Sequence, residues 1–472
     1  MTNHNRDTLY IDGLWVNPHG AGTIDVINPA TEHVIGHVPN GDHHDLDAAV
    51  DAARRSFDPL VSVDERRARL GSIIRAMEKN ADALAETVAH ELGAPLKIAR
   101  ALHVQLGIRA AQGILSTLES YDFEERVGNS LLVREPYGVV GAITPWNYPI
   151  YQVVVKVLPA IAAGCTVVLK PGNEAPLSVF ELVDAIHDEG LPAGVLNVVS
   201  GPGGVIGEAI AAHPGIDLVS FTGSTAVGSR VATVAAGTVK KLTLELGGKS
   251  ANVILDDADL AAAVKVGVGT ALLNGGQTCT AWTRMLVPRA RYDEALELIQ
   301  SAAARYTVGD PFDEATRIGP VVSRKQLESI RGFIDRAEKD GARLLHGGSQ
   351  ELAEIGYYVC PTVFADVDPN SELGQEEVFG PVLAVIPYET EDEALEIANG
   401  TDYGLSGAVW SADTDRAIAF ARRVQTGSLD INGGSHNPLA PFGGYKRSGY
   451  GRELGRAGFE EYLQLKSLQL PS

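Results

Sequence analysis

Cysteine is scarce in this sequence, and its few copies form no recognisable metal or disulfide pattern. Only Cys165, Cys279 and Cys360 occur among 472 residues, with no CxxC pair, and the scattered histidines form no HExxH motif. We therefore expect neither a disulfide framework nor a metal site. Cys165 and Cys360 lie among apolar residues, which predicts that both belong to the core.

Long apolar runs and an excess of positive charge are also lacking. No uninterrupted stretch approaches the ~20 apolar residues of a membrane-spanning helix. The first residues do not show the basic-then-apolar pattern of a secretory signal. Acidic residues outnumber basic ones, 60 to 39, for a formal net charge of −21. Such a surface repels phosphate backbones and anionic membranes. We predict a cytoplasmic protein that binds neither nucleic acid nor a membrane.

The order of apolar patterns predicts an α/β fold with two sheets. At 45% apolar residues and this length, two or three domains are expected. Residues 45–118 have the three- and four-residue spacing of helices. Short apolar strands then alternate with amphipathic helices up to residue 247, which is typical of a parallel doubly wound sheet. The alternation resumes after Gly248, which indicates a second α/β domain. Residues 121–136 and the strand-like end of the chain fit neither sheet.

Cys279 is the leading candidate nucleophile. It lies in the segment "LNGGQTCTAW", among glycines, an asparagine and threonines rather than among apolar residues. Only a thiolate attacks, so a reactive cysteine needs access and a polar setting. The glycines would let a ligand approach closely. On local context alone, a cysteine merely tolerated in a turn is an equally good interpretation.

Two other candidate residues follow strands. Glu245 ends an apolar strand in "LTLELGGK", and Asn147 follows another in "TPWNYP". In open α/β sheets, active sites lie beyond the carboxyl ends of the strands. A desolvated glutamate has a raised pKa and can activate water, while an asparagine amide can stabilise an oxyanion. The alternatives are an ion-paired glutamate and an ordinary turn residue.

Two strand ends are candidates for binding a phosphate or a ribose. "FTGSTAVG" combines a strand, a glycine turn and a helix start, where backbone N–H groups suit a phosphate. It lacks the full GxGxxG pattern, so many glycine turns would look the same. Lys170, in "VLKPGNEAP", ends another strand and could reach a ribose, a phosphate or only solvent.

Taken together, these segments resemble the NAD(P)-dependent aldehyde dehydrogenase superfamily. The matching segments, in the order of that family, are "PWNYP", "LKPGNEAP", "FTGST", "LELGGK", "GGQTCTA", "EEVFGPV" and "PFGGYKRSGYGRELG". Glu245 and Cys279 are 279 − 245 = 34 positions apart, as in the family. The resemblance covers essentially the whole chain. It implies a Rossmann-like dinucleotide-binding domain (residues 1–120 and 137–247), a catalytic domain (248–454) and a small β oligomerisation arm (121–136 and 455–472).

The resemblance also implies a catalytic mechanism. Cys279 would attack the aldehyde carbonyl, with the oxyanion held by the Asn147 amide and the Cys279 backbone N–H. Hydride transfer would leave a thioester, and Glu245 would activate water to hydrolyse it. Lys156 matches a family lysine in a proton path.

NAD is the implied cofactor, with NADP left open. Family members that prefer NAD often carry glutamate where this chain has Asn173, and a neutral amide would not repel a 2′-phosphate. The residues that the resemblance assigns to the cofactor are Ile143, Thr144, Pro145, Trp146, Lys170, Asn173, Phe221, Thr222, Gly223, Ser224, Gln326, Glu377 and Phe379.

The substrate and assembly are less defined by the sequence. Tyr151, Gln152 and Val155, one turn beyond Asn147, and Thr278 and Thr280 beside the cysteine would line the substrate pocket, which favours a medium-sized apolar or aromatic aldehyde. The arm implies a homodimer or homotetramer, with the tail pairing with a neighbouring chain.

Three alternatives remain open. A CoA-acylating relative would pass the thioester to coenzyme A, although such relatives typically lack the glutamate. A cysteine hydrolase would need a base, for which His436 is the nearest candidate. A binding protein that kept the fold without activity would not need Asn147, Glu245 and Cys279 together.

Overall fold

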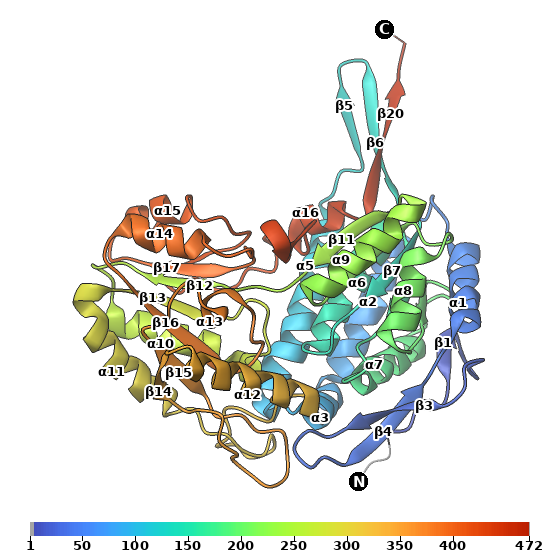
Figure 1. Cartoon of the computed structure of the whole chain (residues 1–472). Helices are drawn as coiled ribbons and strands as arrows, with labels where there is room; N and C mark the ends of the chain where they lie inside the picture. Colours follow the sequence, from blue (N-terminus) through green and yellow to red (C-terminus); the bar gives the residue numbers. More distant parts are fainter. Residues whose placement is uncertain (1–3, 472) are drawn as a thin grey trace.

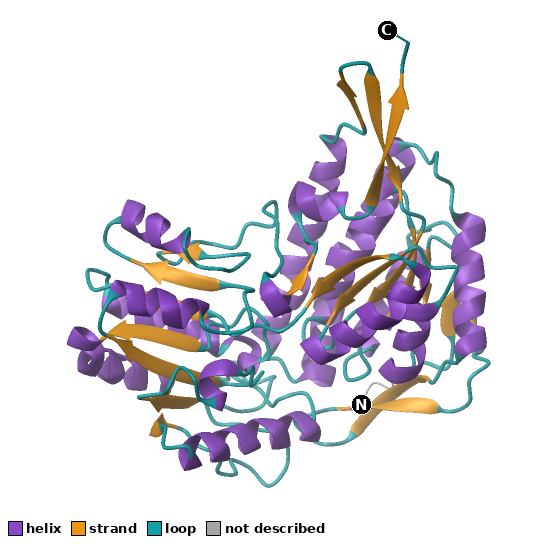
Figure 2. Cartoon of the chain, turned by 45° about the horizontal axis from the view of Figure 1, so that its top comes forward, coloured by secondary structure: helices purple, strands orange, loops and turns teal. Residues whose placement is uncertain are grey.

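The structure, a computed structural model, describes residues 4–471 and consists of two α/β lobes and a projecting β arm (Figure 1). The first lobe is built on an eight-stranded sheet and the second on a seven-stranded sheet. Figure 2 shows helices packed against both sheets and a long β ribbon that projects away from the first lobe; this ribbon is a three-stranded sheet. The predicted α/β fold class is confirmed.

The sheet of the first lobe has a parallel centre with antiparallel strands added at its sides. Its strands, in spatial order, are β19 (Gly449–Tyr450), β11 (Lys241–Glu245), β10 (Leu218–Thr222), β7 (Val139–Ile143), β8 (Thr166–Lys170), β9 (Leu196–Val198), β1 (Leu9–Ile11) and β2 (Leu14–Val16). β7 to β11 are parallel, while β19, β1 and β2 are antiparallel additions. Because the central strands β7, β8 and β10 are buried along their whole length, helices have to cover both faces of the sheet.

Helices cover those two faces as two groups. α1 (His43–Ser56), α8 (Glu208–Ala212) and α9 (Thr225–Ala235) pack together on one side. The other side carries α2 (Val63–Lys79), α3 (Ala81–Leu92), α5 (Leu106–Glu119), α6 (Pro149–Ala163) and α7 (Leu177–Asp188), with the short α4 (Leu96–Ile98) and the π-helical η1 (Ala99–Gln105) beside them. The helices predicted between residues 45 and 118 are confirmed, whereas the hairpin of β3 (Thr23–Ile27) and β4 (Val34–Pro39) had no signal in the sequence analysis.

The second lobe repeats the layered arrangement. Its strands, in spatial order, are β14 (Arg343–His346), β15 (Thr362–Ala365), β16 (Val382–Tyr388), β13 (Arg284–Pro288), β12 (Ala251–Ile254), β17 (Gly407–Trp410) and β18 (Asp430–Ile431). Its helices are α10 (Leu260–Ala271), α11 (Tyr292–Ala303), α12 (Arg324–Lys339), α13 (Glu372–Gln375), α14 (Glu391–Asn399) and α15 (Thr414–Ala421). Neighbouring residues such as Val253 and Ile254 enter separate apolar clusters on opposite faces, as a strand buried on both sides requires.

The arm and the end of the chain connect distant parts of the sequence. After α16 (Gly455–Glu460), β20 (Leu463–Gln469) pairs antiparallel with β6 (Ser130–Pro136), which also pairs with β5 (Glu124–Val127). The tail, which was expected to pair with a neighbouring chain, pairs through one edge of β20 with β6 of its own chain. The other edge of β20 has no partner among the described residues. β19, from the segment that the sequence assigns to the catalytic domain, lies instead in the sheet of the first lobe.

Two general expectations can be compared with these residues. Within residues 4–471, no helix has both the length and the apolar character needed to cross a membrane. The same range contains no group of three or more histidine, cysteine, aspartate or glutamate residues arranged for a metal ion. Cys165 is buried, as predicted, whereas Cys360 is only half-buried.

Candidate active site

Cys279 lies in a loop shaped by left-handed backbone. Within the short η4 (Leu273–Gly276), Asn274, Gly275 and Gly276 have φ angles of 53°, 65° and 72°. A Cβ atom on Gly276 would lie 2.0 Å from the Gly380 carbonyl oxygen. Left-handed backbone and such a close approach both favour glycine. The glycines beside Cys279 are thus needed for the turn that presents its half-buried side chain to a cleft.

The surroundings of the Cys279 thiol are apolar and negative. Burial is the largest cause of its raised pKa, and the carboxylates of Glu377, Glu245 and Glu453 raise it further. The resting thiol is therefore protonated. The charged groups that act on it are carboxylates, whereas His436 lies in the exposed loop 432–437. This environment differs from the cysteine–histidine pair that a cysteine hydrolase needs.

Asn147 is fixed against the cysteine loop. It lies between β7 and α6, where Pro149 occupies the first turn of the helix, a favourable place for proline. Its side-chain Nδ2 donates a hydrogen bond to the Gln277 carbonyl oxygen at 3.0 Å. Its own carbonyl oxygen accepts a hydrogen bond from Asn274 Nδ2 at 3.0 Å. The predicted oxyanion residue and the predicted nucleophile are thus brought together from two lobes.

Glu245 ends β11 next to the glycine turn that follows β10. The Gly223 N–H donates a hydrogen bond to the Glu245 carbonyl oxygen at 3.1 Å. The Glu245 side chain is buried, and neither carboxylate oxygen has a hydrogen-bond partner among the described residues. Burial, followed by the charge of Glu453, raises its pKa well above the usual value. The carboxylate lies behind the cleft, whose wall is formed by the next two residues, Leu246 and Gly247.

A buried ion pair lies close to Glu245. Lys156 on α6 is fully buried and pairs with Glu453, which is itself buried. The charges of Lys156 and Arg452 oppose the rise in the pKa of Glu245. Sequence reasoning singled out Lys156 but missed Glu453. The available signal was an acidic residue inside the glycine-rich "GYGRELG" segment.

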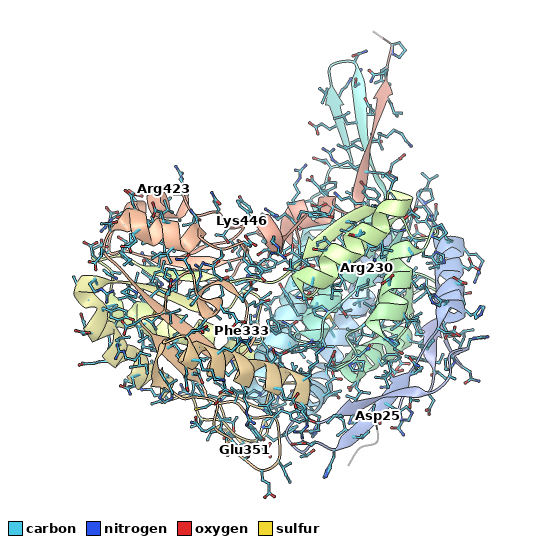
Figure 3. All side chains as sticks on the ribbon, viewed as in Figure 1. Asp25, Arg230, Phe333, Glu351, Arg423 and Lys446 are labelled. Carbon is cyan, nitrogen blue, oxygen red and sulfur yellow. The ribbon has the colours of Figure 1, made fainter. Side chains whose placement is uncertain are left out.

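A cleft of about 310 Å³ between the lobes contains many of the predicted residues. Its lining includes Pro145, Trp146, Asn147, Thr222, Gly223, Ser224, Cys279, Gln326, Glu377 and Phe379. Figure 3 shows the side chains of both lobes as sticks, and its label for Lys446 marks the region where the two lobes meet. One cleft therefore joins the candidate nucleophile to the glycine turn at the start of α9.

The second lobe holds Glu377 and Phe379 in defined positions. Glu377 Oε1 accepts a hydrogen bond from the Gly248 N–H at 3.1 Å. Burial raises the pKa of Glu377 to about 7, although the charge of Lys249 lowers it. Gln326 Nε2 donates to the Phe379 carbonyl oxygen at 2.8 Å. A Cβ on Gly248 would lie 2.5 Å from the Cys279 carbonyl oxygen, which accounts for the second glycine of "LELGGK".

Phe379 has strained backbone and an aromatic neighbour. Its φ of 54° is uncommon for a non-glycine residue. Its ring meets Trp146 edge-on, with centroids 5.4 Å apart and planes at 85°. Strain of this kind concentrates at ligand sites, and here it holds an aromatic ring at the cleft.

The remaining predicted cofactor residues do not line this cleft. They are Ile143, Thr144, Lys170, Asn173 and Phe221. The ammonium of Lys170 donates to the Pro171 carbonyl oxygen at 2.8 Å and to Asn173 Oδ1 at 3.1 Å. Burial lowers the pKa of Lys170 to about 8. The Phe221 ring packs under Gly223, where an added Cβ would lie 2.6 Å from it.

Comparisons with known proteins agree with this geometry. A family model described as the aldehyde dehydrogenase family matches residues 15–468. A 3-succinoylsemialdehyde-pyridine dehydrogenase from a Pseudomonas species is 48% identical over 98% of both chains. Aldehyde dehydrogenase C from Pseudomonas syringae, solved with NAD+ and octanal, has a TM-score of 0.98 at 45% identity, covering 99% of this chain and 97% of its own.

A third relative extends the structural agreement. An aldehyde dehydrogenase from Mycobacterium tuberculosis, solved with NAD+, has a TM-score of 0.97 at 42% identity, over 100% of this chain and 99% of its own. The family model and these relatives each span nearly the full length of the sequence. This chain belongs to the aldehyde dehydrogenase family.

Proposed function

We propose that this protein oxidises an aldehyde to its carboxylic acid with NAD+, through a covalent bond between Cys279 and the aldehyde carbon. The observation that carries the proposal is the single cleft that joins Cys279 and Asn147 to the turn Thr222–Ser224 and to Glu377. Nucleophile, oxyanion donor and dinucleotide-binding elements then act on one substrate.

The residues present suit a bound dinucleotide. The Thr222 hydroxyl is buried without a partner among the described residues, so it can bond to a ligand. Ser224 caps α9, whose N-terminus favours a phosphate. Lys170 with Asn173 would hold the adenosine ribose, and Glu377 the nicotinamide ribose. NAD+ supplies the hydride acceptor when bound. The relatives from Pseudomonas syringae and Mycobacterium tuberculosis were solved with NAD+, which supports NAD+ rather than NADP+ as the cofactor proposed for this protein.

The chain's own groups would carry out the remaining chemistry. Cys279 would release its thiol proton to water, its Sγ would form the bond to the carbonyl carbon, and the Asn147 amide with the Cys279 backbone N–H would stabilise the oxyanion. Loss of hydride to NAD+ leaves a thioester on the sulfur. Glu245 then takes a proton from water, which attacks the thioester and releases the acid and the thiol. One aldehyde, one NAD+ and one water give one acid, one NADH and one proton.

We propose a medium-sized apolar or aromatic aldehyde as substrate. Val155 and Gln152 on α6 are buried, and Tyr151 is half-buried beside them. The Pseudomonas syringae relative was solved with octanal, and the Pseudomonas relative is named for a pyridine-bearing semialdehyde. Both aldehydes have the size and the apolar portion that such a pocket accepts.

Hydrolysis is favoured over transfer to coenzyme A, because Glu245 provides a base for water. A panel of aliphatic, aromatic and charged aldehydes, ranked by kcat/KM with NAD+ and then NADP+, tests the proposal. Acid and NADH should form in equal amounts without coenzyme A. A panel headed by succinic semialdehyde or betaine aldehyde, or a large preference for NADP+, would contradict the proposed specificity.

We also propose that the arm mediates assembly into a dimer or tetramer. The free outer edge of β20 offers backbone groups for pairing with another chain. Light scattering of the full chain should give a dimer or tetramer mass, and removal of residues 463–472 should lower it. A monomer at micromolar concentration would refute this part of the proposal.

A further inference from the structure

His103 is a buried polar residue to which the proposed reaction assigns no part. It lies in η1 and is completely buried, yet neither ring nitrogen meets hydrogen-bond geometry with a described residue. Leaving a buried donor unsatisfied destabilises the folded state. Such a group in a native structure calls for an explanation.

One face of the His103 ring stacks on Tyr148. Their centroids are 4.6 Å apart and their planes differ by 15°. The Tyr148 hydroxyl lies 2.8 Å from the Thr278 hydroxyl oxygen in a hydrogen bond. Tyr148 follows Asn147 in the chain, and Thr278 precedes Cys279. The imidazole therefore lies directly behind residues adjacent to the oxyanion donor and the nucleophile.

The polar side chain that acts on the His103 ring belongs to Asn274. Asn274 Oδ1 is likewise buried without a hydrogen-bond partner, whereas its Nδ2 donates to the Asn147 carbonyl oxygen. A neutral imidazole carries one N–H donor, and an amide oxygen is a hydrogen-bond acceptor. A hydrogen bond between the two side chains would satisfy both groups and would fix which end of the Asn274 amide faces Asn147.

We propose that His103 is a positioning residue, whose N–H bonds to Asn274 Oδ1 and so locks the amide that holds the Asn147 main chain in place. The inference rests on the proposed function, since it assigns Asn147 to the oxyanion. His103 acts as the neutral form, because burial lowers its pKa to about 3.

Two substitutions separate the hydrogen bond from the stacking. His103→Phe keeps a flat ring on Tyr148 but removes the N–H, and His103→Gln keeps a donor but removes the ring. We expect His103→Phe to lower kcat about tenfold, because small misplacements of a catalytic group are costly, with the KM for NAD+ and the Tm little changed. His103→Gln should recover most of that loss. His90→Phe is the matched control, since His90 on α3 packs its ring against Phe312 and neither residue lines the cleft.

A double substitution tests whether His103 acts through Asn274. The variant His103→Phe/Asn274→Ala should be no slower than Asn274→Ala alone, because the second change removes an interaction that is already lost. Losses that multiply would overturn the proposal, as would a His103→Phe kcat within twofold of wild type or a His103→Gln kcat as low as that of His103→Phe.

The remaining outcomes are also decisive. If His103→Phe does not fold, His103→Gln takes its place, and a kcat below a tenth of wild type with the donor present would overturn the proposal. A wild-type protein that forms no NADH from any aldehyde would remove the proposed function itself. If the wild-type protein does form NADH, the kcat values of the variants relative to wild type test the part played by His103 independently of the proposed function.

Discussion

Glu245, buried in the first lobe, and Glu377, half-buried in the second, both contribute a carboxylate near the segment "LELGGK", yet their environments differ. The Glu245 carboxylate receives no hydrogen bond from a described residue and lies near the charge of Glu453. Glu377 accepts the Gly248 N–H at 3.1 Å and lies near the positive charge of Lys249. Burial raises both pKa values, and nearby positive charges oppose the rise in both cases, but only the Glu377 carboxylate also accepts a hydrogen bond that favours its ionised form.

This difference separates a base from a binding group. A carboxylate without donors gains most by taking a proton, which suits the activation of water. A carboxylate that is already hydrogen-bonded keeps a defined orientation and can accept a ligand hydroxyl. Substitutions in the two regions should therefore affect different kinetic parameters.

The largest effect is expected where both regions converge, at the thiol. Cys279→Ala should abolish NADH formation while leaving NAD+ binding intact, because no other group can form the covalent bond. Steady-state assays together with fluorescence titration of NAD+ measure the two properties. Turnover that persisted in the variant, or wild-type protein showing no substrate adduct at Cys279 by mass spectrometry, would disprove the covalent mechanism.

Removing the unbonded carboxylate should affect the second half of the reaction. Glu245→Gln should lower steady turnover by about a thousandfold, within the usual range for a general base, after a normal burst of NADH. Rapid-mixing absorbance and intact-protein mass spectrometry should detect the accumulated thioester. Steady turnover equal to that of wild type would contradict the role of base.

The same carboxylate predicts a pH dependence. Only ionised Glu245 can take a proton, so hydrolysis should be lost as the pH falls through its raised pKa. The burst phase of Glu245→Gln should lack this dependence. A wild-type turnover rate that stays flat from pH 5 to pH 9 would be inconsistent with the environment of Glu245.

Asn147 should show an intermediate effect on the first half of the reaction. Asn147→Ala should slow the NADH burst itself by roughly a hundredfold, the usual loss for one oxyanion donor. Asn147→Asp is the matched variant, since it has the same shape but lacks the donor, and it should be at least as slow. A slow steady state after a normal burst would instead indicate that Asn147 acts in thioester hydrolysis, as proposed for Glu245.

The smallest effect is expected for the hydrogen-bonded carboxylate. Glu377→Gln should raise the KM for NAD+ about tenfold, since a hydrogen bond to a charged group contributes about 1.5–3 kcal/mol. NAD+ binding to wild type should strengthen as the pH rises through about 7, where Glu377 ionises. Binding to the variant should not. An unchanged KM for NAD+ with a large loss of thioester hydrolysis would mean that Glu377 acts in hydrolysis, as proposed for Glu245, and not in NAD+ binding.

Local patterns in the sequence predicted the layered fold and the strand ends that carry Glu245 and Lys170. β16 was not predicted from the sequence, because "VLAVIPY" is a continuous apolar run that contains a proline and does not alternate between apolar and polar residues. β1 and β2 were not predicted either, because each is only three residues long. Patterns of this length do not separate strands from loops.

Contacts between distant residues explain what was missed at the site. Lys156 and Glu453 are 297 positions apart, so nothing near either residue predicts their ion pair. His103 and Asn274, the proposed partners, are likewise far apart in the sequence. Local turns and strand ends singled out Cys279, Glu245 and Asn147 as candidates, and the family resemblance implied their roles, whereas a buried partner leaves no such local pattern.

The short strand β19 has a consequence for splitting the protein. It pairs with Leu244 and Glu245, although it follows almost the whole second lobe in the chain. A chain cut in the exposed loop 432–437 would give two fragments. The first would contain every residue that lines the cleft, and the second would contain β19, which pairs with Glu245. Neither piece alone would hydrolyse a thioester, and their reassembly would restore turnover, so this loop is a natural breakpoint for a two-part reporter.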